Sequence, residues 1–204
     1  MIDRSAAREG FAQVAEAVAG GVDWLQVRER ELSDTALAEL AEGAAAAARE
    51  GARRAGRKVR VVVNRRGDVA LAVGADGVHL GFDALTPAAA RRLLGDDALV
   101  GVSCHQPDEI EAAEGASYAQ LAPIFAPLSK AVSREPLGVG ALTRARGARP
   151  VLAQGGITAE NAHACLTAGA AGVAVTGAIL QAADAGAAAR GLRQALDGAA
   201  GIRA

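Results

Sequence analysis

Short apolar segments alternate along the chain with longer stretches that are rich in alanine. Apolar runs of four or five residues bounded by glycine or polar residues predict buried strands, and the alanine-rich stretches predict helices. One helix is expected over about 35–52 after a Ser33 or Asp34 cap, and another begins at Thr86-Pro87. Strands alternating with helices predict a parallel sheet. The strands are expected at 24–27, 59–63, 77–80, 99–103, 118–121, 151–154 and 172–175.

A glycine-led step from helix to strand recurs four times, beginning at Gly20, Gly74, Gly115 and Gly169. The first glycine of each copy is expected to take a left-handed helix cap. The copies lie 54, 41 and 54 residues apart, which suits two strand–helix units each. Four pairs make eight units, so we predict a single (β/α)₈ TIM-barrel domain over 1–204. Its first strand would be the very short Met1–Asp3, unless the native start lies upstream; an open doubly wound sheet is the alternative.

Composition narrows the class of protein. Hydrophobic residues make up 51% of the chain but aromatic residues only 2%, so alanine, valine and leucine must build the core. The formal net charge of −1 gives no reason to expect nucleic acid, and no apolar run is long enough to span a membrane. The two cysteines lack metal-ligand spacing. We therefore expect a cytoplasmic protein, and the basic cluster at 49–60 is interpreted as a solvated helix end.

Two strand-to-glycine-to-helix turns near the end of the chain predict a phosphate site. Gly155-Gly156 follows the apolar run 151–154, and Thr176-Gly177 follows the run 172–175. Glycine lets the backbone approach an anion closely, and helix starts present free N–H groups. In a β/α barrel the phosphate cup lies after the last two strands, although ordinary βα turns would also use glycine.

The active residues of such a barrel lie at the carboxyl ends of its strands. Cations and hydrogen-bond donors collect there, which favours a multiply charged anion such as a phosphate or diphosphate ester. The loop 122–140 is long enough to act as a lid. His79 is expected inside the barrel, and Cys104 and His105 point to opposite faces. The strand-end candidates are Gln26, Arg28, Arg30, Asn64, Arg65 and Ser103, with Ser129 and Lys130 in the loop.

Several segments together resemble the family of thiamine phosphate synthase and its relative the thiazole tautomerase. They are Gln26–Arg30, Asn64–Arg66, Gly74–Gly81, Gly101–His105, Pro123–Lys130 and Gly155–Ile157. The resemblance implies a (β/α)₈ barrel in thiamine biosynthesis whose synthase joins a pyrimidine methyl diphosphate to a thiazole phosphate. It places Gln26, Arg28, Asn64 and Lys130 at the pyrimidine and diphosphate, Ser103 near the pyrimidine, and Gly155, Gly156, Thr176 and Gly177 at the thiazole phosphate.

This chain departs from the family pattern where the family binds Mg²⁺. Arg65 stands in place of one metal-binding aspartate and Ala84 in place of the other, a change of about +3 in local charge, which should repel the metal. These departures imply no certain metal; Mg²⁺ could still enter through the substrate diphosphate, and the sequence leaves open whether Asp83 takes the metal position left by Ala84. Arg65 would then join Arg28 and Lys130 as a catalytic residue. The tautomerase histidine aligns with Pro123, which cannot transfer a proton.

Three functions remain open at this point. The first is a synthase-like transferase that acts on small phosphorylated substrates. The second is a non-catalytic barrel that binds thiamine phosphate or its precursors. The third is a tautomerase-like phosphate-ester isomerase, in which Glu29, Asp83, Cys104 or His105 would supply acid–base chemistry. The sequence does not set the oligomeric state.

Overall fold

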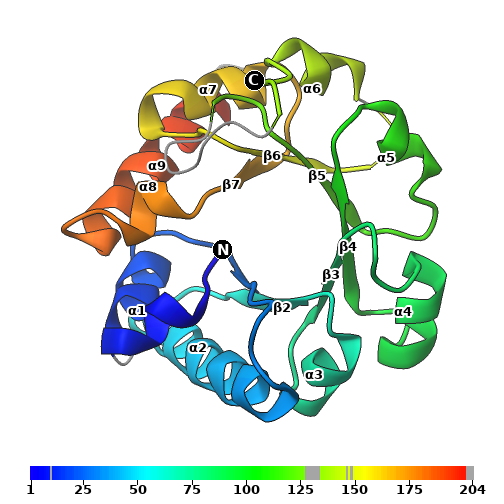
Figure 1. Ribbon diagram of the computed structural model, residues 1–204. Coiled ribbons are helices and arrows are strands. Elements are labelled where there is room, and N and C mark those ends of the chain that lie inside the picture. The colour runs from blue at the N-terminus through cyan, green and yellow to red at the C-terminus, as the bar shows by residue number, and fades with distance from the viewer. Residues whose placement is uncertain (10, 127–133, 146, 148, 201–204) are drawn as a thin grey trace.

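The computed structural model describes residues 1–9, 11–126, 134–145, 147 and 149–200. Within them, seven parallel strands form one curled sheet whose spatial order follows the sequence (Figure 1). The seven strands expected between residues 24 and 175 are all present, with bounds that differ by no more than one residue. The strands are β1 Trp24–Val27, β2 Arg60–Asn64, β3 Gly77–Leu80, β4 Leu99–Cys104, β5 Tyr118–Leu121, β6 Val151–Gln154 and β7 Gly172–Ala174.

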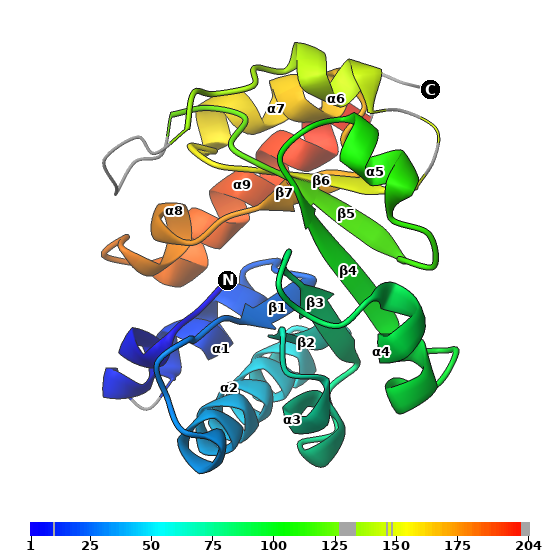
Figure 2. The same cartoon turned by 45° about the vertical axis from the view of Figure 1, so that its right-hand side comes forward.

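The helices lie outside this ring of strands (Figures 1 and 2). The hydroxyl of Ser33 accepts from the N–H of Ala36 and caps α2, and Thr86 caps α4 ahead of Pro87. The described helices are a 3₁₀ turn η1 Arg4–Glu9, then α1 Ala12–Ala19, α2 Asp34–Arg54, α3 Gly67–Ala72, α4 Pro87–Leu94, α5 Asp108–Ala112, α6 Gly140–Arg144, α7 Ala159–Thr167, α8 Gly177–Leu180 and α9 Ala185–Ala200. No described helix combines the length and apolar character needed to cross a bilayer.

The expected first strand is reduced to a single bridge at Ile2. Its N–H donates to the carbonyl of Gln26 at 2.8 Å, and its carbonyl accepts from the N–H of Arg28 at 2.8 Å. On the other side the amino group of Met1 donates to the carbonyl of Val175 at 2.7 Å. The first two residues therefore lie between β7 and β1 and close the barrel there (Figure 1).

The first copy of the glycine step differs from the expected left-handed cap. Gly74 and Gly169 have φ of 60° and 110°, as predicted, but Gly20 has φ of −74° and Gly21 takes the positive φ of 124°. A Cβ on Gly20 would lie 2.4 Å from the carbonyl oxygen of Gly186. Gly20 is thus needed for the close approach of α9 to α1, and its neighbour makes the turn.

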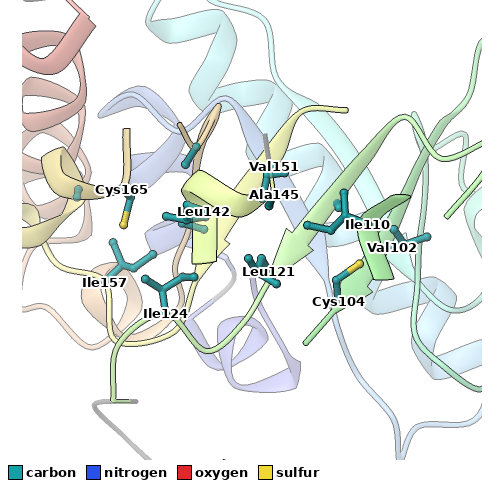
Figure 3. Packing of buried hydrophobic residues seen from close by; sticks show 14 of the residues in the cluster. Val102, Cys104, Ile110, Leu121, Ile124, Leu142, Ala145, Val151, Ile157 and Cys165 are labelled. Atoms are coloured by element: carbon teal, nitrogen blue, oxygen red, sulfur yellow. The ribbon is translucent and has the colours of Figure 1, made fainter. Parts of the chain in front are cut away.

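The hydrophobic core lies between the sheet and its helices. Alternate strand residues such as Leu25 and Val27 face α1 and α2, whereas Leu121 packs among Ile124 and Leu142 on the other side of the molecule (Figure 3). Period-two alternation sends the intervening residues into the barrel. Several of these interior residues are polar. The buried polar side chains of the described residues are Gln26, Asn64, His79 and Gln120.

Candidate active site

Three arginines gather where β1 and β2 end. Arg28 and Arg30 continue β1, and Arg65 follows β2. Burial lowers the pKa of the half-buried Arg28, and the charge of Arg30 and, more weakly, of Arg65 lowers it further, while Asp3 and Glu29 act in the opposite direction. In the described part of the chain, neither Arg28 nor Arg30 has a carboxylate in ion-pair contact. The strand ends therefore carry concentrated positive charge that is open to an anion.

Arg65 is held in an unusual backbone conformation. Its φ is 68°, in the left-handed region that residues other than glycine rarely adopt. Its N–H donates to the carbonyl of His79 at 2.7 Å, which ties the turn to β3, and its guanidinium forms an ion pair with Asp83. The hydrogen bond from Arg65 holds the pKa of Asp83 below its usual range. The sequence indicated Arg65 and Asp83 separately but not this pair.

The carboxylate of Glu29 is held by Arg4 and by backbone N–H groups rather than by the side chains of the arginine cluster. It accepts from Nε of Arg4 at 2.9 Å and from the backbone N–H groups of Arg30 and Glu31 at 2.7 Å and 3.2 Å. Burial would raise the pKa of Glu29, but these N–H groups and Arg4 lower it overall. Glu29 is thus a structural anion rather than a base.

The other acid–base candidates are also engaged. Burial raises the pKa of the Cys104 thiol to about 11, so it is protonated at neutral pH. Nδ1 of His105 lies 2.8 Å from the carbonyl oxygen of Ala122, and the ring stacks on Phe82 with centroids 4.9 Å apart. Phe82 is 64% exposed, and sequence reasoning gave it no role. These contacts weaken the isomerase hypothesis.

The amide of Gln26 has no internal partner. Its side chain is 5% exposed, and in the described residues neither its nitrogen nor its oxygen forms a hydrogen bond. It lines a cavity of about 630 Å³ that extends from the strands to helices α1 and α9 and reaches the amino ends of the strands at Trp24 and Leu99. A buried amide without a partner costs about 1–3 kcal/mol, so a ligand that pairs with it would recover that free energy.

His79 is an interior residue, as its place in an alternating strand predicts. Its ring nitrogens lie 3.1 Å from the hydroxyl of Tyr118 and 2.9 Å from the hydroxyl of Ser103. Burial, and to a smaller extent the charge of Arg28, lowers the pKa of His79 to about 3. The neutral ring therefore fixes the position of Ser103 at the end of β4.

The two glycine turns lie at the ends of β6 and β7, as predicted. Gly155 and Gly156 have φ of 95° and 60°, and their N–H groups donate to no group in the part of the chain that the structure describes. Both glycines also pack against the loop after β5, where a Cβ would lie 2.8 Å from Cα of Pro123 and 2.2 Å from the carbonyl oxygen of Ala126. The role of these glycines in packing against the loop is not apparent from the sequence alone.

The second turn leads from β7 into the short helix α8. Thr176 is its N-cap and makes no side-chain capping bond, and Gly177 is its first residue. This turn and the one at Gly155 and Gly156 follow neighbouring strands, β7 and β6, at their carboxyl ends.

The structure thus brings the predicted site residues to the same end of the sheet in two sets. The first comprises Gln26, Arg28, Arg30, Asn64, Arg65 and Ser103, on β1, β2 and β4 or directly after them; the second comprises the four cup residues. The predicted roles of Ser129 and Lys130, and most of the predicted lid, lie outside the described residues.

The basic cluster at 49–60 is neutralised by carboxylates. Arg53 pairs with Glu50 at 2.7 Å, and Arg54 pairs with Glu16 at 2.9 Å. Arg57 contacts Asp23 in the same way. These surface pairs agree with a solvated helix end rather than a separate anion-binding surface.

Comparison with known proteins decides the family. The family model described as thiamine monophosphate synthase matches residues 2–179. The chain belongs to the thiamine monophosphate synthase family. Within this family, the thiamine-phosphate synthase of Moorella thermoacetica is 43% identical over 192 residues, covering 92% of this chain and 89% of that protein. That of Anaeromyxobacter dehalogenans is 43% identical over 190 residues, covering 91% and 82%.

A solved structure of the same family has the same fold. Thiamine phosphate pyrophosphorylase from Pyrococcus furiosus superposes with a TM-score of 0.82 at 29% identity, covering 97% of this chain and 93% of that one. The barrel predicted from the glycine repeat is therefore confirmed, with its first strand shortened.

The described residues of this family member offer no ready cluster of ligands for a resident Mg²⁺ ion. Mg²⁺ is normally bound through carboxylates in proteins. No group of three or more acidic, histidine or cysteine side chains in the described ranges could hold a metal. Asp83 is already bound to Arg65, and Ala84 offers no side-chain ligand.

Proposed function

We propose that this protein is a thiamine-phosphate synthase, which joins a pyrimidine methyl diphosphate to a thiazole phosphate and releases diphosphate. The observation that carries the proposal is the pair of anion-binding features at one end of the barrel. The cluster Arg28, Arg30 and Arg65 suits a diphosphate, and the cup at Gly155-Gly156 and Thr176-Gly177 suits a single phosphate. The names of the relatives agree with this assignment.

The chemistry of this reaction suits such a site. The bond between the pyrimidine methylene carbon and the diphosphate oxygen breaks, and the electron pair leaves with diphosphate. The ring nitrogen of the thiazole then supplies the pair for the new carbon–nitrogen bond. The reaction as written transfers no proton, so it does not need a general base beside Arg28. Cations aimed at the departing oxygens stabilise the transition state directly.

Buried polar groups would orient the pyrimidine. Gln26 offers an unpaired donor and acceptor, and Asn64 is equally buried at the end of β2. Ser103 is fixed by His79 at the end of β4. We assign these three side chains to the pyrimidine ring, and Lys130 to the diphosphate.

The test is product formation by the purified protein from the two substrates, followed by chromatography of thiamine phosphate. Reactions contain either Mg²⁺ or EDTA, and a reaction without thiazole phosphate is the control. Thiamine phosphate in either condition supports the transferase. Binding of both substrates with no product in either condition would contradict it and would identify a binding barrel instead.

A further inference from the structure

A cation stands after β2 where the family resemblance implies a metal-binding carboxylate. The resemblance implies one carboxylate at the position of Arg65 and a second at the position of Ala84, which follows β3. The left-handed φ of Arg65 and the hydrogen bond from its N–H to His79 fix the backbone from which the guanidinium extends. Its side chain is 27% exposed, so a ligand can reach it.

The electrostatics of this region disfavour a divalent cation. The three arginines are close enough to affect one another electrostatically. Besides burial, the charges of Arg30 and Arg65 lower the pKa of Arg28, and besides the hydrogen bond from Arg65, the same two charges lower the pKa of Asp83. Among the described residues, the contact of Arg65 with Asp83 is the one ion pair that these three arginines make. A divalent ion placed here would meet three positive charges, while the nearby carboxylates of Asp83 and Glu29 are already paired with Arg65 and Arg4.

A guanidinium can supply what the metal would otherwise supply. It carries a permanent positive charge and grips two oxygens of a phosphate group with two parallel hydrogen bonds. The carboxylate of Asp83 accepts one such hydrogen bond from Arg65 in the free protein, as an internal anion. A diphosphate with its higher charge would displace Asp83 and bind in its place.

We propose that Arg65, together with Arg28 and Arg30, binds the diphosphate group directly and takes the place of a protein-bound divalent metal. This inference rests on the proposed function for the identity of the ligand. The breaking carbon–oxygen bond leaves its electron pair on the diphosphate, and the three guanidiniums neutralise that charge. No co-reactant beyond the two substrates is needed.

The test measures binding of inorganic pyrophosphate by calorimetry, in EDTA and in Mg²⁺, with no second substrate present. The wild-type protein is expected to bind in EDTA at least as tightly as in Mg²⁺. Arg65→Asn should weaken binding in EDTA about 10- to 100-fold, since two charge-assisted hydrogen bonds are lost. Asparagine tolerates a positive φ better than most residues, so this variant should fold.

The control is Arg92→Gln, which removes an exposed guanidinium on α4 and should leave binding unchanged. Circular dichroism verifies the fold of each variant. Binding of pyrophosphate only in Mg²⁺, or wild-type affinity in Arg65→Asn, would overturn the inference.

A reciprocal variant, Arg65→Asp with Ala84→Asp, restores two carboxylates. It should lose binding in EDTA and regain it in Mg²⁺; binding in EDTA that persists would count against the inference. The outcomes also separate the two proposals. A wild-type protein that makes thiamine phosphate but binds pyrophosphate only with Mg²⁺ is a synthase in which this inference fails. A protein that binds pyrophosphate in EDTA but makes no product keeps the anion site and loses the proposed function.

Discussion

Asp83 and Arg65 form an ion pair across the ends of β3 and β2, so the protein carries its own competitor for the anion site. Both residues come from segments next to the arginine cluster, and Asp83 also feels the charge of Arg30. Removing the carboxylate should release the guanidinium without removing a cation.

We expect Asp83→Asn to bind pyrophosphate about 3- to 10-fold more tightly in EDTA, because the exposed ion-pair partner that competes for Arg65 is lost. Calorimetry on Asp83→Asn and on the control Asp97→Asn, an exposed residue after α4, measures the effect. An unchanged or weaker affinity in Asp83→Asn would show that Asp83 does not compete for Arg65.

The unpaired amide of Gln26 predicts opposite effects on stability and on activity. Gln26→Leu removes a buried polar group that has no partner, so the free energy of unfolding should rise by about 1 kcal/mol or stay unchanged. The same change should lower kcat/KM for the pyrimidine substrate about 10- to 100-fold, because the ring loses its hydrogen-bond partner. Urea unfolding and steady-state kinetics measure the two effects. A clear loss of stability in Gln26→Leu would mean that the amide has a structural partner.

The glycines of the cup should differ in their importance for folding. Gly156→Ala forces a side chain into a φ of 60° and places Cβ 2.2 Å from the carbonyl oxygen of Ala126. We expect it to lower the free energy of unfolding by about 2 kcal/mol or more. Gly177→Ala meets only the end of the Gln181 side chain at 2.9 Å, which can move, so its effect should stay under about 1 kcal/mol.

Urea unfolding of both glycine variants measures the two losses of unfolding free energy. Equal losses of stability would contradict the assignment of Gly156 to loop packing. Thiazole phosphate binding by Gly177→Ala then reports on the cup in a protein that remains folded.

The buried His79 predicts a loss of stability in mild acid. Its pKa in the folded protein is about 3, below the value of 6.5 that it has when unfolded. The folded state therefore keeps the ring neutral while the unfolded state binds a proton, and stability present above pH 6.5 is lost as the pH falls towards 3. The slope should approach 1.4 kcal/mol per pH unit for this one proton.

Urea unfolding between about pH 6.5 and 4.5 measures this slope, in a range above that in which the paired carboxylates titrate. His79→Gln should show a shallower dependence than the wild type. His163→Gln, which removes an exposed histidine of α7, should leave the slope unchanged. Equal slopes in all three proteins would show that His79 does not carry the effect.

The fold could be predicted because it depends on patterns that are local in sequence. Apolar runs, the Ser33 and Thr86 caps and the recurring glycine step each report on a few neighbouring residues, and the strands follow from them. The left-handed cap predicted at Gly20 was wrong because the close approach of α9, which lies far along the chain, determines the backbone conformation there. Tertiary contact overrides a local signal there.

The types of residue at the site could also be predicted, but not their partners. Alternation predicts that Gln26 in β1 and Arg28 directly after it share one side, yet it does not reveal that Arg4 binds Glu29. The packing of Gly155 against Pro123 was equally invisible, because it joins two loops about thirty residues apart. The predicted roles of individual residues in binding remain predictions.

The single tryptophan and single tyrosine of this chain lie against one another at the amino ends of β1 and β5. The rings of Trp24 and Tyr118 meet edge to face with centroids 4.9 Å apart, and Tyr118 leads through His79 to Ser103 at the strand ends. All indole fluorescence therefore originates beside the barrel cavity, at the start of β1. The protein carries a native optical probe of this cavity, which needs no label.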